Sequence, residues 1–170
     1  MDYFQDLIQG NHCFGCGPHN PAGLQIKSAW SGEKESVCVF QPSAHHCAAP
    51  TKFLNGGIIA TIIDCHSVCT AIAYAYRRAG RSIGQGEPVW YATGHMAVDF
   101  KRPVPIHGPV TLKAGVQSES EKRITLECRL ISDDKVCVES RVVAVQVPVA
   151  WMERWCNGFM IGPGRRRCRS

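Results

Sequence analysis

The sequence predicts an α+β fold in which an antiparallel sheet is wrapped around one long central helix. Three observations lead to this prediction: two short alternating runs near the N-terminus, one long helical segment over residues 56–79, and four long alternating runs after it. The helical segment has small or aliphatic residues on nearly all sides, so it should be buried around most of its circumference. A helix that is surrounded by strands alone has no core to occupy except the face of their sheet.

The N-terminal part of the chain predicts a short helix, a loop and a hairpin. Residues 1–9 have apolar side chains at helical spacing, and residues 10–23 are rich in Gly, Pro and Asn, which is typical of turns. The runs 24–30 and 36–41 alternate between apolar and polar residues on either side of a polar turn, so they predict a β-hairpin. Residues 42–50 follow as a loop.

The rest of the chain predicts the central helix and four strands. Arg77 and Arg78 suit the C-terminal end of the helix, where cations favour its dipole, and Gly80 suits its termination. After a glycine-containing loop the pattern changes to the period of a strand. Turn residues divide this second half into four predicted strands, over residues 89–102, 110–119, 123–131 and 136–147.

Charge is unevenly distributed along the 170 residues. Most of the net charge of +5 arises from residues 151–170, which have five Arg and one acidic residue, Glu153, and leave 14 basic and 13 acidic residues in the first 150. Residues 1–150 are therefore predicted to form one domain, and residues 151–170 a basic C-terminal tail that is partly disordered. A nucleic-acid-binding protein usually carries its positive charge on a folded face, so no nucleic-acid partner is expected.

The apolar segments do not predict a membrane protein. The longest of them, residues 58–76, contains Asp64 near its middle, and an unpaired carboxylate is expensive in lipid. The N-terminus begins with acidic residues and lacks the pattern of a secretion signal, so a cytoplasmic location with reduced thiols is expected for the ten Cys.

The cysteines invite a metal-binding interpretation, which the spacing does not favour. Cys13 and Cys16 form a Cys-x-x-Cys pair, but a structural zinc site needs four ligands, usually as two close pairs. Cys65 and Cys69 lie one helical turn apart and are interpreted as small buried packing residues. We therefore expect no metal site.

Asp64 is the candidate catalytic group within the predicted helix. Its neighbours in the sequence are mostly apolar, and burying a carboxylate is costly unless a partner or a function compensates. One interpretation is a general base or nucleophile. The other is a structural hydrogen bond to a loop, or to Thr61 or Ser67.

Several short motifs, taken together and in order, carry a family resemblance. They are CFGCG at residues 13–17, NPAGL at 20–24, LNGGIIATIID at 54–64 and DFKRP at 99–103. Their order and spacing resemble the hotdog-fold acyl-coenzyme A thioesterases related to the phenylacetate-pathway thioesterase, over roughly residues 13–147. The resemblance implies a hotdog fold and hydrolysis of an acyl-coenzyme A, with coenzyme A as part of the substrate and no separate cofactor.

The resemblance also implies roles for individual residues. Gly56 and Gly57 open the helix, where free N–H groups could stabilise an oxyanion. Asn55 stands where the family usually has His, so it can donate a hydrogen bond but cannot titrate near neutral pH. Asp64 would activate water or attack the thioester, and Thr93 would help to orient the water.

Two further implications concern the substrate and a second subunit. Lys101 and Arg102, at the end of a predicted strand, could bind the phosphates of coenzyme A. Gly57 and Asp64 are seven residues apart, which is about 10 Å of helix rise, so one small thioester cannot touch both. A homodimer, or a dimer of such dimers, would bring Asp64 of one subunit to the helix start of the other.

Two other functions remain open at this stage. The absence of the family's His favours a non-catalytic protein that binds acyl-coenzyme A or another small ligand. An enoyl-coenzyme A hydratase or dehydratase would need a His beside a carboxylate. His95 is the candidate, because two-residue spacing in a strand places it on the same face as Thr93.

Overall fold

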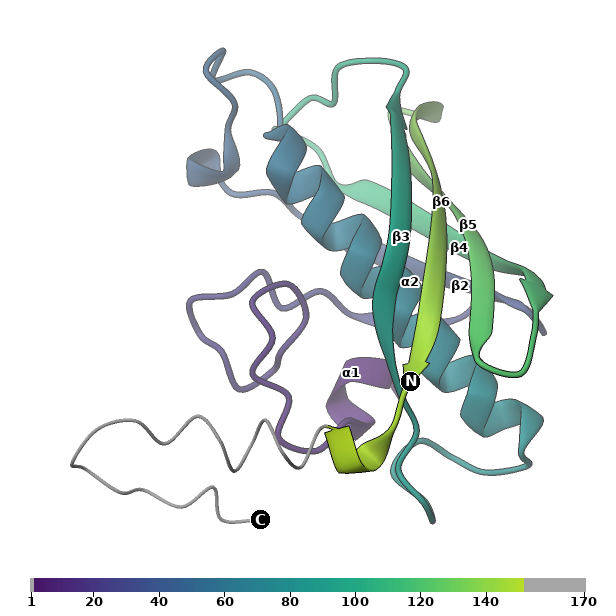
Figure 1. The fold of residues 1–170 in the computed structure, drawn as a ribbon. Coiled ribbons are helices and arrows are strands. Elements are labelled where there is room, and N and C mark those ends of the chain that lie inside the picture. The colour runs from purple at the N-terminus through teal and green to yellow at the C-terminus, as the bar shows by residue number, and fades with distance from the viewer. Residues whose placement is uncertain (1, 152–170) are drawn as a thin grey trace.

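One six-stranded sheet and one long helix make up most of the molecule (Figure 1). The computed structural model describes residues 2–151. In the sheet the strands follow the order β1-β2-β4-β5-β6-β3, and every neighbouring pair is antiparallel. The elements are α1 (Phe4–Leu7), β1 (Ser28–Trp30), β2 (Glu35–Phe40), the 3₁₀ turn η1 (Ala44–His46), α2 (Gly56–Arg78), β3 (Trp90–Phe100), β4 (Val110–Glu119), β5 (Arg123–Ser132) and β6 (Lys135–Val147).

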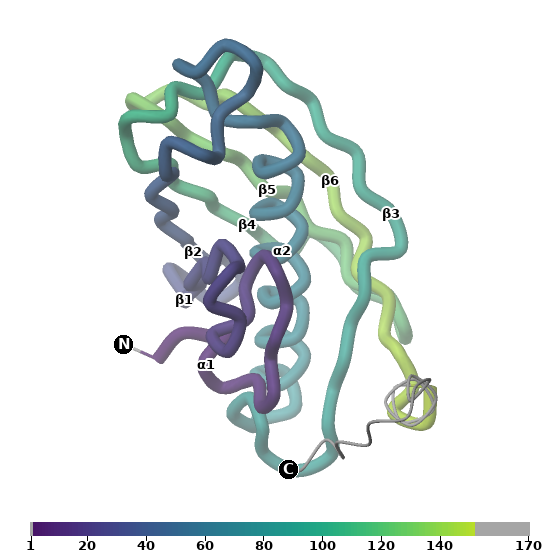
Figure 2. The backbone as a smooth tube through the Cα atoms, turned by 90° about the vertical axis from the view of Figure 1, so that its left-hand side faces the viewer, coloured from purple at the N-terminus to yellow at the C-terminus, as the bar shows by residue number. Residues whose placement is uncertain are grey.

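Helix α2 is the centre of the core. Figure 2 shows it between the β1–β2 side and the β3 side of the curved sheet, with the N-terminal loop lying over it. Ile62 and Ile63 are fully buried, as are Leu112 and Leu130 of the facing strands. Burying each such side chain stabilises the fold by roughly 1.5–3 kcal/mol. The arrangement is the hotdog fold, and the predicted sheet around a central helix is confirmed.

By length and composition α2 also resembles a membrane span. It is the one helix within residues 2–151 with that property, and 67% of its most apolar window is buried inside the fold. The core helix of a globular protein has the same character, because its apolar side chains face protein on several sides.

The N-terminal elements are shorter than the sequence predicts. Only four residues of the predicted helix 1–9 are helical, because the chain turns extended at Ile8. The predicted strand 24–30 begins only at Ser28. The N–H groups of Leu24 and Ile26 donate instead to carbonyls of the preceding loop, at 2.7 and 3.1 Å, so they are not available to a sheet.

The ends of the second-half strands shift by at most two residues from their predicted positions. The predicted basic tail falls almost entirely on residues 152–170, which lie outside the described part of the chain. The division into a domain and a tail therefore stays a prediction.

A β-bulge in β3 decides which side chains face the helix. Thr93 pairs with Ala144 and His95 pairs with Val143, so the extra residue is Gly94. Ala144 is fully buried on the inner face of the sheet, whereas Val143 belongs to the other face. Thr93 therefore faces α2 and His95 faces away from it. The prediction that the two share a face is wrong, because a bulge reverses the alternation of a strand.

Gly94 is required at this bulge. A Cβ atom there would lie 2.4 Å from a methyl group of Val145 on the neighbouring strand, which is closer than carbon atoms can approach. Glycine thus allows the sheet to close around the irregularity that turns Thr93 inward.

Candidate active site

The central contact of the site joins α2 to β3. The Thr93 hydroxyl donates a hydrogen bond to Oδ1 of Asp64. Asp64 is half-buried and Thr93 exposed, so this pair lies at the surface of the groove between helix and edge strand. The bond orients the carboxylate and leaves its second oxygen open to a ligand. The two residues that the resemblance paired in function are therefore in direct contact.

The structural alternative for Asp64 is not what the contacts show. The Thr61 hydroxyl donates to the Gly57 carbonyl at 2.8 Å and not to Asp64. The Ser67 hydroxyl is buried and has no hydrogen-bond partner within residues 2–151. Within residues 2–151, Asp64 instead accepts its hydrogen bond from Thr93 of the edge strand.

Asp64 and Thr93 line a cavity of about 310 Å³. Most of its wall is apolar, with contributions from Val68, Ile72 and Trp90. A second, less apolar cavity of about 270 Å³ adjoins it and shares Ile8, Ile72 and Trp90 with it. A polar pair at one side of an apolar hollow is the usual composition of a small-molecule site.

The start of α2 is capped by Asn55. Its Oδ1 accepts hydrogen bonds from the N–H groups of Gly57 at 2.8 Å and Ile58 at 3.3 Å. The expectation that the Gly57 N–H is free for an oxyanion is therefore wrong, because an Asn that precedes a helix satisfies that donor itself. Within residues 2–151, the N–H of Gly56 has no acceptor and stays available.

The cap also fixes which way the Asn55 amide points. Because Oδ1 accepts from two backbone N–H groups, Nδ2 is the remaining polar group of this exposed side chain. It has no acceptor among the described residues, so it can donate to a ligand together with the Gly56 N–H. Gly57 is needed beside it, since a Cβ there would lie 3.0 Å from Asn55 Oδ1.

The structure keeps the two halves of the predicted site apart along one chain. α2 is continuous from Gly56 to Arg78, so Gly57 and Asp64 are separated by about 10 Å of rise. Phe100 of β3 lies beside the helix start, 3.7 Å from where a Gly56 Cβ would be, whereas Thr93 lies beside Asp64. Helix α2 and edge strand β3 thus run in opposite directions. The helix start lies beside the C-terminal end of β3, and Asp64 lies beside Thr93.

Lys101 and Arg102 lie at the Gly56 end of this groove, directly after β3, and both are exposed. Lys101 Nζ lies 3.7 Å from carboxylate oxygens of both Asp99 and Glu139. Arg102 donates to the Val136 carbonyl at 2.7 Å. Their other donor positions face solvent, so these cations could still bind phosphate.

The sequence analysis missed one part of the wall beside Asp64. Cys13 and Cys16 from the N-terminal loop and Cys65 and Cys69 from α2 all line the same cavity. Hydrogen bonds from neighbouring thiols, that of Cys13 first, lower the pKa of Cys16 well below its usual range. The sequence signal for this part of the cavity wall was the CFGCG motif at residues 13–17. Only the tertiary structure shows that this motif packs against α2.

Comparison with known proteins identifies the family. The sequence profile of the thioesterase superfamily matches residues 51–139, which is more than half of the chain. The chain belongs to the thioesterase superfamily. The matched segment of this superfamily member contains the site residues from Asn55 to Arg102, whereas the N-terminal loop that completes the cavity wall lies before it.

Individual relatives are more distant. The acyl-coenzyme A thioesterase THEM4 of Rattus norvegicus is 26% identical over 113 residues, which are 66% of this chain and 43% of that protein. The chain thus spans less than half the length of the curated relatives it matches. A thioesterase superfamily protein from Shewanella loihica is 27% identical, with a TM-score of 0.62 over 82% of this chain and 96% of that one.

The PaaI protein from the phenylacetic acid degradation operon of E. coli shares the fold. Its TM-score is 0.60 at 13% identity, over 74% of this chain and 81% of PaaI. The family resemblance of the sequence motifs is thereby confirmed, and the likeness to PaaI itself extends to the fold.

Proposed function

We propose that the protein hydrolyses the thioester of an acyl-coenzyme A to a carboxylic acid and free coenzyme A. The observation that carries this proposal is the Asp64 carboxylate, oriented by the Thr93 hydroxyl at the mouth of a mostly apolar cavity. Membership of the thioesterase superfamily supports thioester hydrolysis. The name of the THEM4 relatives supports acyl-coenzyme A as the substrate class.

The chemistry needs one base and two donors. With Oδ1 held by Thr93, the other oxygen of Asp64 accepts a proton from water, and the oxygen of that water adds to the thioester carbon. The Gly56 N–H and Asn55 Nδ2 stabilise the oxyanion that forms. Collapse of the oxyanion expels the sulfur of coenzyme A, which leaves with the proton. Direct attack by the carboxylate, followed by hydrolysis of the anhydride, uses the same groups.

A homodimer would supply both halves to one reaction centre. β3 is an edge strand that pairs only with β6 among the described residues, and residues 92–95 along it are exposed. Antiparallel pairing of two β3 strands about a two-fold axis would place two copies of α2 antiparallel. Asp64 of each copy would then approach the Asn55–Gly56 helix start of the other.

The same arrangement assigns the remaining parts of the substrate. The cavity beside Asp64 would receive the acyl group, because it lies next to the carboxylate and most of its wall is apolar. Lys101 and Arg102 lie beside the helix start, where the phosphates of coenzyme A would extend towards solvent.

An Asp64→Asn variant tests the catalytic role. Turnover should fall by about 10²–10⁴, because the amide cannot accept the proton. Coenzyme A release is measured by chromatography, since a thiol reagent would also react with the ten Cys of the chain. Asp133→Asn is the matched control: Asp133 lies in the β5–β6 turn at φ 48°, a conformation that Asn accepts readily. Equal turnover of the Asp64→Asn and Asp133→Asn proteins would disprove the assignment.

A mixing experiment tests the shared site. Asp64→Asn and Asn55→Ala chains, refolded together in equal amounts, should recover about a quarter of wild-type turnover, because half of the dimers are mixed and each has one intact site. If each chain contained its own complete site, the mixture would show only the mean of the two variants.

A binding protein without turnover is the second candidate function. It is favoured by Asn55, which cannot titrate as the family's usual His does. Binding of a panel of acyl-coenzyme A esters without hydrolysis of any of them would support it. The hydratase alternative loses its basis, since the bulge turns His95 away from Asp64.

A further inference from the structure

Four cysteine thiols converge where the N-terminal loop crosses α2. The Sγ atoms of Cys13, Cys16 and Cys65 all lie within 4.8 Å of one another. Cys13 Sγ is 3.6 Å from Cys65 Sγ, and Cys16 Sγ is 3.8 Å from Cys69 Sγ. Of the eight cysteines within residues 2–151, these four form a group, whereas buried Cys38 and Cys128 are spread through the sheet.

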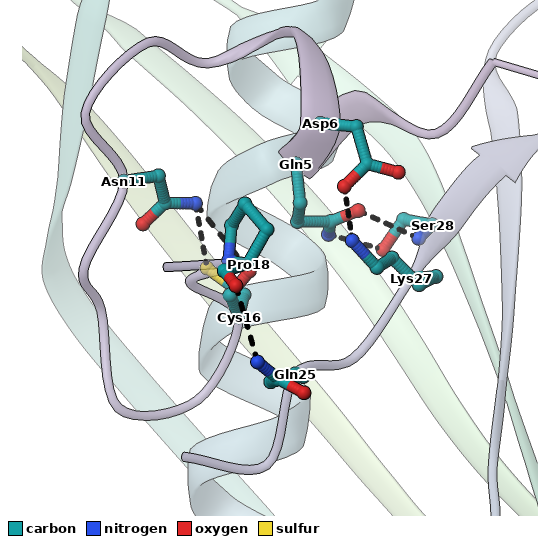
Figure 3. A network of polar contacts seen from close by, with 8 residues as sticks. All are labelled: Gln5, Asp6, Asn11, Cys16, Pro18, Gln25, Lys27 and Ser28. Carbon is teal, nitrogen blue, oxygen red and sulfur yellow. Dashed lines mark hydrogen bonds and ion pairs between the residues drawn. The ribbon is translucent and has the colours of Figure 1, made fainter. Parts of the chain in front are cut away.

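The loop is built to hold its two thiols against the helix. The Gly17 N–H donates to the Cys13 carbonyl at 2.8 Å and closes the turn around the Cys-x-x-Cys segment. A Cβ on Gly15 would lie 2.3 Å from Cys65 Sγ, so only glycine lets the loop approach α2 this closely. Figure 3 shows the Asn11 side chain directed at Cys16, where Nδ2 lies 3.4 Å from the carbonyl and 3.7 Å from Sγ.

The spacing of the sulfurs matches a tetrahedral metal site. With zinc–sulfur bonds of about 2.3 Å, two sulfurs of a tetrahedron are roughly 3.8 Å apart. Two of the separations, 3.6 and 3.8 Å, each join a loop cysteine to a helix cysteine. The loop pair has x₂ spacing and the helix pair x₃, so the structure provides the second close pair that the sequence analysis did not recognise as one.

We propose that Cys13, Cys16, Cys65 and Cys69 bind one Zn²⁺ ion, which fastens the N-terminal loop to α2 beside Asp64. Thiolate sulfur is a soft ligand that selects zinc over the harder divalent cations. The three mutually close thiols supply three ligands, and Cys69, whose Sγ is 3.8 Å from that of Cys16, supplies the fourth when its side chain turns towards the ion. Each thiol that binds releases its proton to solvent, and no oxidant or reductant is needed. The assignment of the zinc ligands does not rest on the proposed hydrolysis of acyl-coenzyme A.

Metal titration of the full-length, reduced chain tests the site. After treatment with a chelator and a thiol-free reductant, it should take up about one Zn²⁺ per chain with a Kd below about 1 μM. Co²⁺ in its place should give the sulfur-to-metal charge transfer and intense visible bands of a tetrahedral thiolate site. A reduced chain that takes up no zinc at this affinity would overturn the proposal.

Variants locate the ion. A Cys16→Ser/Cys65→Ser protein should bind at least about a hundredfold more weakly. Cys47→Ser, outside the cluster, and Cys156→Ser/Cys168→Ser, in the tail sequence, should bind as the wild type does. Undiminished binding by the Cys16→Ser/Cys65→Ser protein would refute the assignment of these ligands.

A footprint on the wild-type chain covers the case in which that double variant does not fold. Zinc should protect Cys13, the exposed thiol of the four, from alkylation, as mapped by mass spectrometry, while half-buried Cys47 continues to react. Absence of protection would overturn the proposal. Disulfides Cys13–Cys65 and Cys16–Cys69 in the isolated protein, with no zinc uptake after reduction, would assign the cluster to redox chemistry instead.

Discussion

Two polar residues on α2, His66 and Asp64, lie two positions apart and face opposite sides of the helix. His66 is fully buried, and its ring nitrogens contact the hydroxyls of Ser28 at 2.8 Å and Ser36 at 3.3 Å. Asp64 is half-buried at the open edge and has one hydrogen bond, from Thr93. The fold encloses His66 completely, whereas Asp64 is oriented by Thr93 and stays accessible.

The His66 side joins four elements into one buried network. Gln5 of α1 donates to Ser28 of β1 at 2.8 Å and accepts from its N–H at 2.7 Å, as Figure 3 shows. Ser36 of β2 lies 2.6 Å from the Thr70 hydroxyl on α2. Because each polar group there has partners, this network rigidifies the fold and leaves no group for a substrate. The comparison teaches that burial with full satisfaction indicates structure, and partial exposure with one partner indicates function.

The largest expected effect is a difference between the two residues in how their substitution changes the free energy of unfolding. His66→Ala should lower the free energy of unfolding by about 3 kcal/mol, since it leaves a cavity and removes a partner from buried hydroxyls. Asp64→Asn should change it by less than about 1 kcal/mol. Urea unfolding at one fixed protein concentration measures both. A His66→Ala protein as stable as the wild type would break the comparison.

The next effect is pH-dependent stability. Burial lowers the pKa of His66 from 6.5 to about 4. The unfolded chain therefore binds this proton at a higher pH than the folded chain, and stability must fall as the pH decreases from about 6.5 to about 4. The loss from this one group is up to about 3 kcal/mol. His66→Gln, which does not titrate, should have a flatter stability profile across that window. Parallel profiles of the two proteins would contradict the prediction.

A smaller effect distinguishes the two roles of Asn55. Asn55→Ala should lose about 1 kcal/mol of stability, because the cap of α2 disappears. Asn55→Asp keeps an acceptor for the Gly57 N–H but loses the amide donor, so its stability should be retained while turnover falls about tenfold. Thermal unfolding and steady-state kinetics measure the two quantities. Full turnover by Asn55→Asp would show that Nδ2 has no part in the reaction.

The smallest expected effect sharpens the role of Thr93. Thr93→Val preserves the shape but not the hydroxyl, so turnover should fall roughly tenfold, with little change in stability at this exposed position. Thr93→Ser should restore most of the activity, because it restores the donor to Asp64. The measurement is the ratio of kcat between the Val and Ser variants. A ratio near one would show that the Thr93 hydroxyl has no part in the reaction.

Much of this molecule follows from local sequence pattern. The apolar circumference of residues 56–79 predicts a central helix, and its observed bounds differ by one residue. Asp64 is conspicuous in the sequence as a carboxylate among aliphatic residues, and its catalytic role stays a prediction. The helix prediction succeeds because helix periodicity depends on residues that are close in the chain.

Only the tertiary structure decided the rest. The bulge at Gly94 depends on how β3 pairs with β6, and it turns Thr93 towards Asp64 and His95 away. The four thiols meet because loop and helix, some fifty residues apart, pack together through Gly15. Strand register and loop docking arise from contacts between distant segments, so no local pattern in the sequence encodes them.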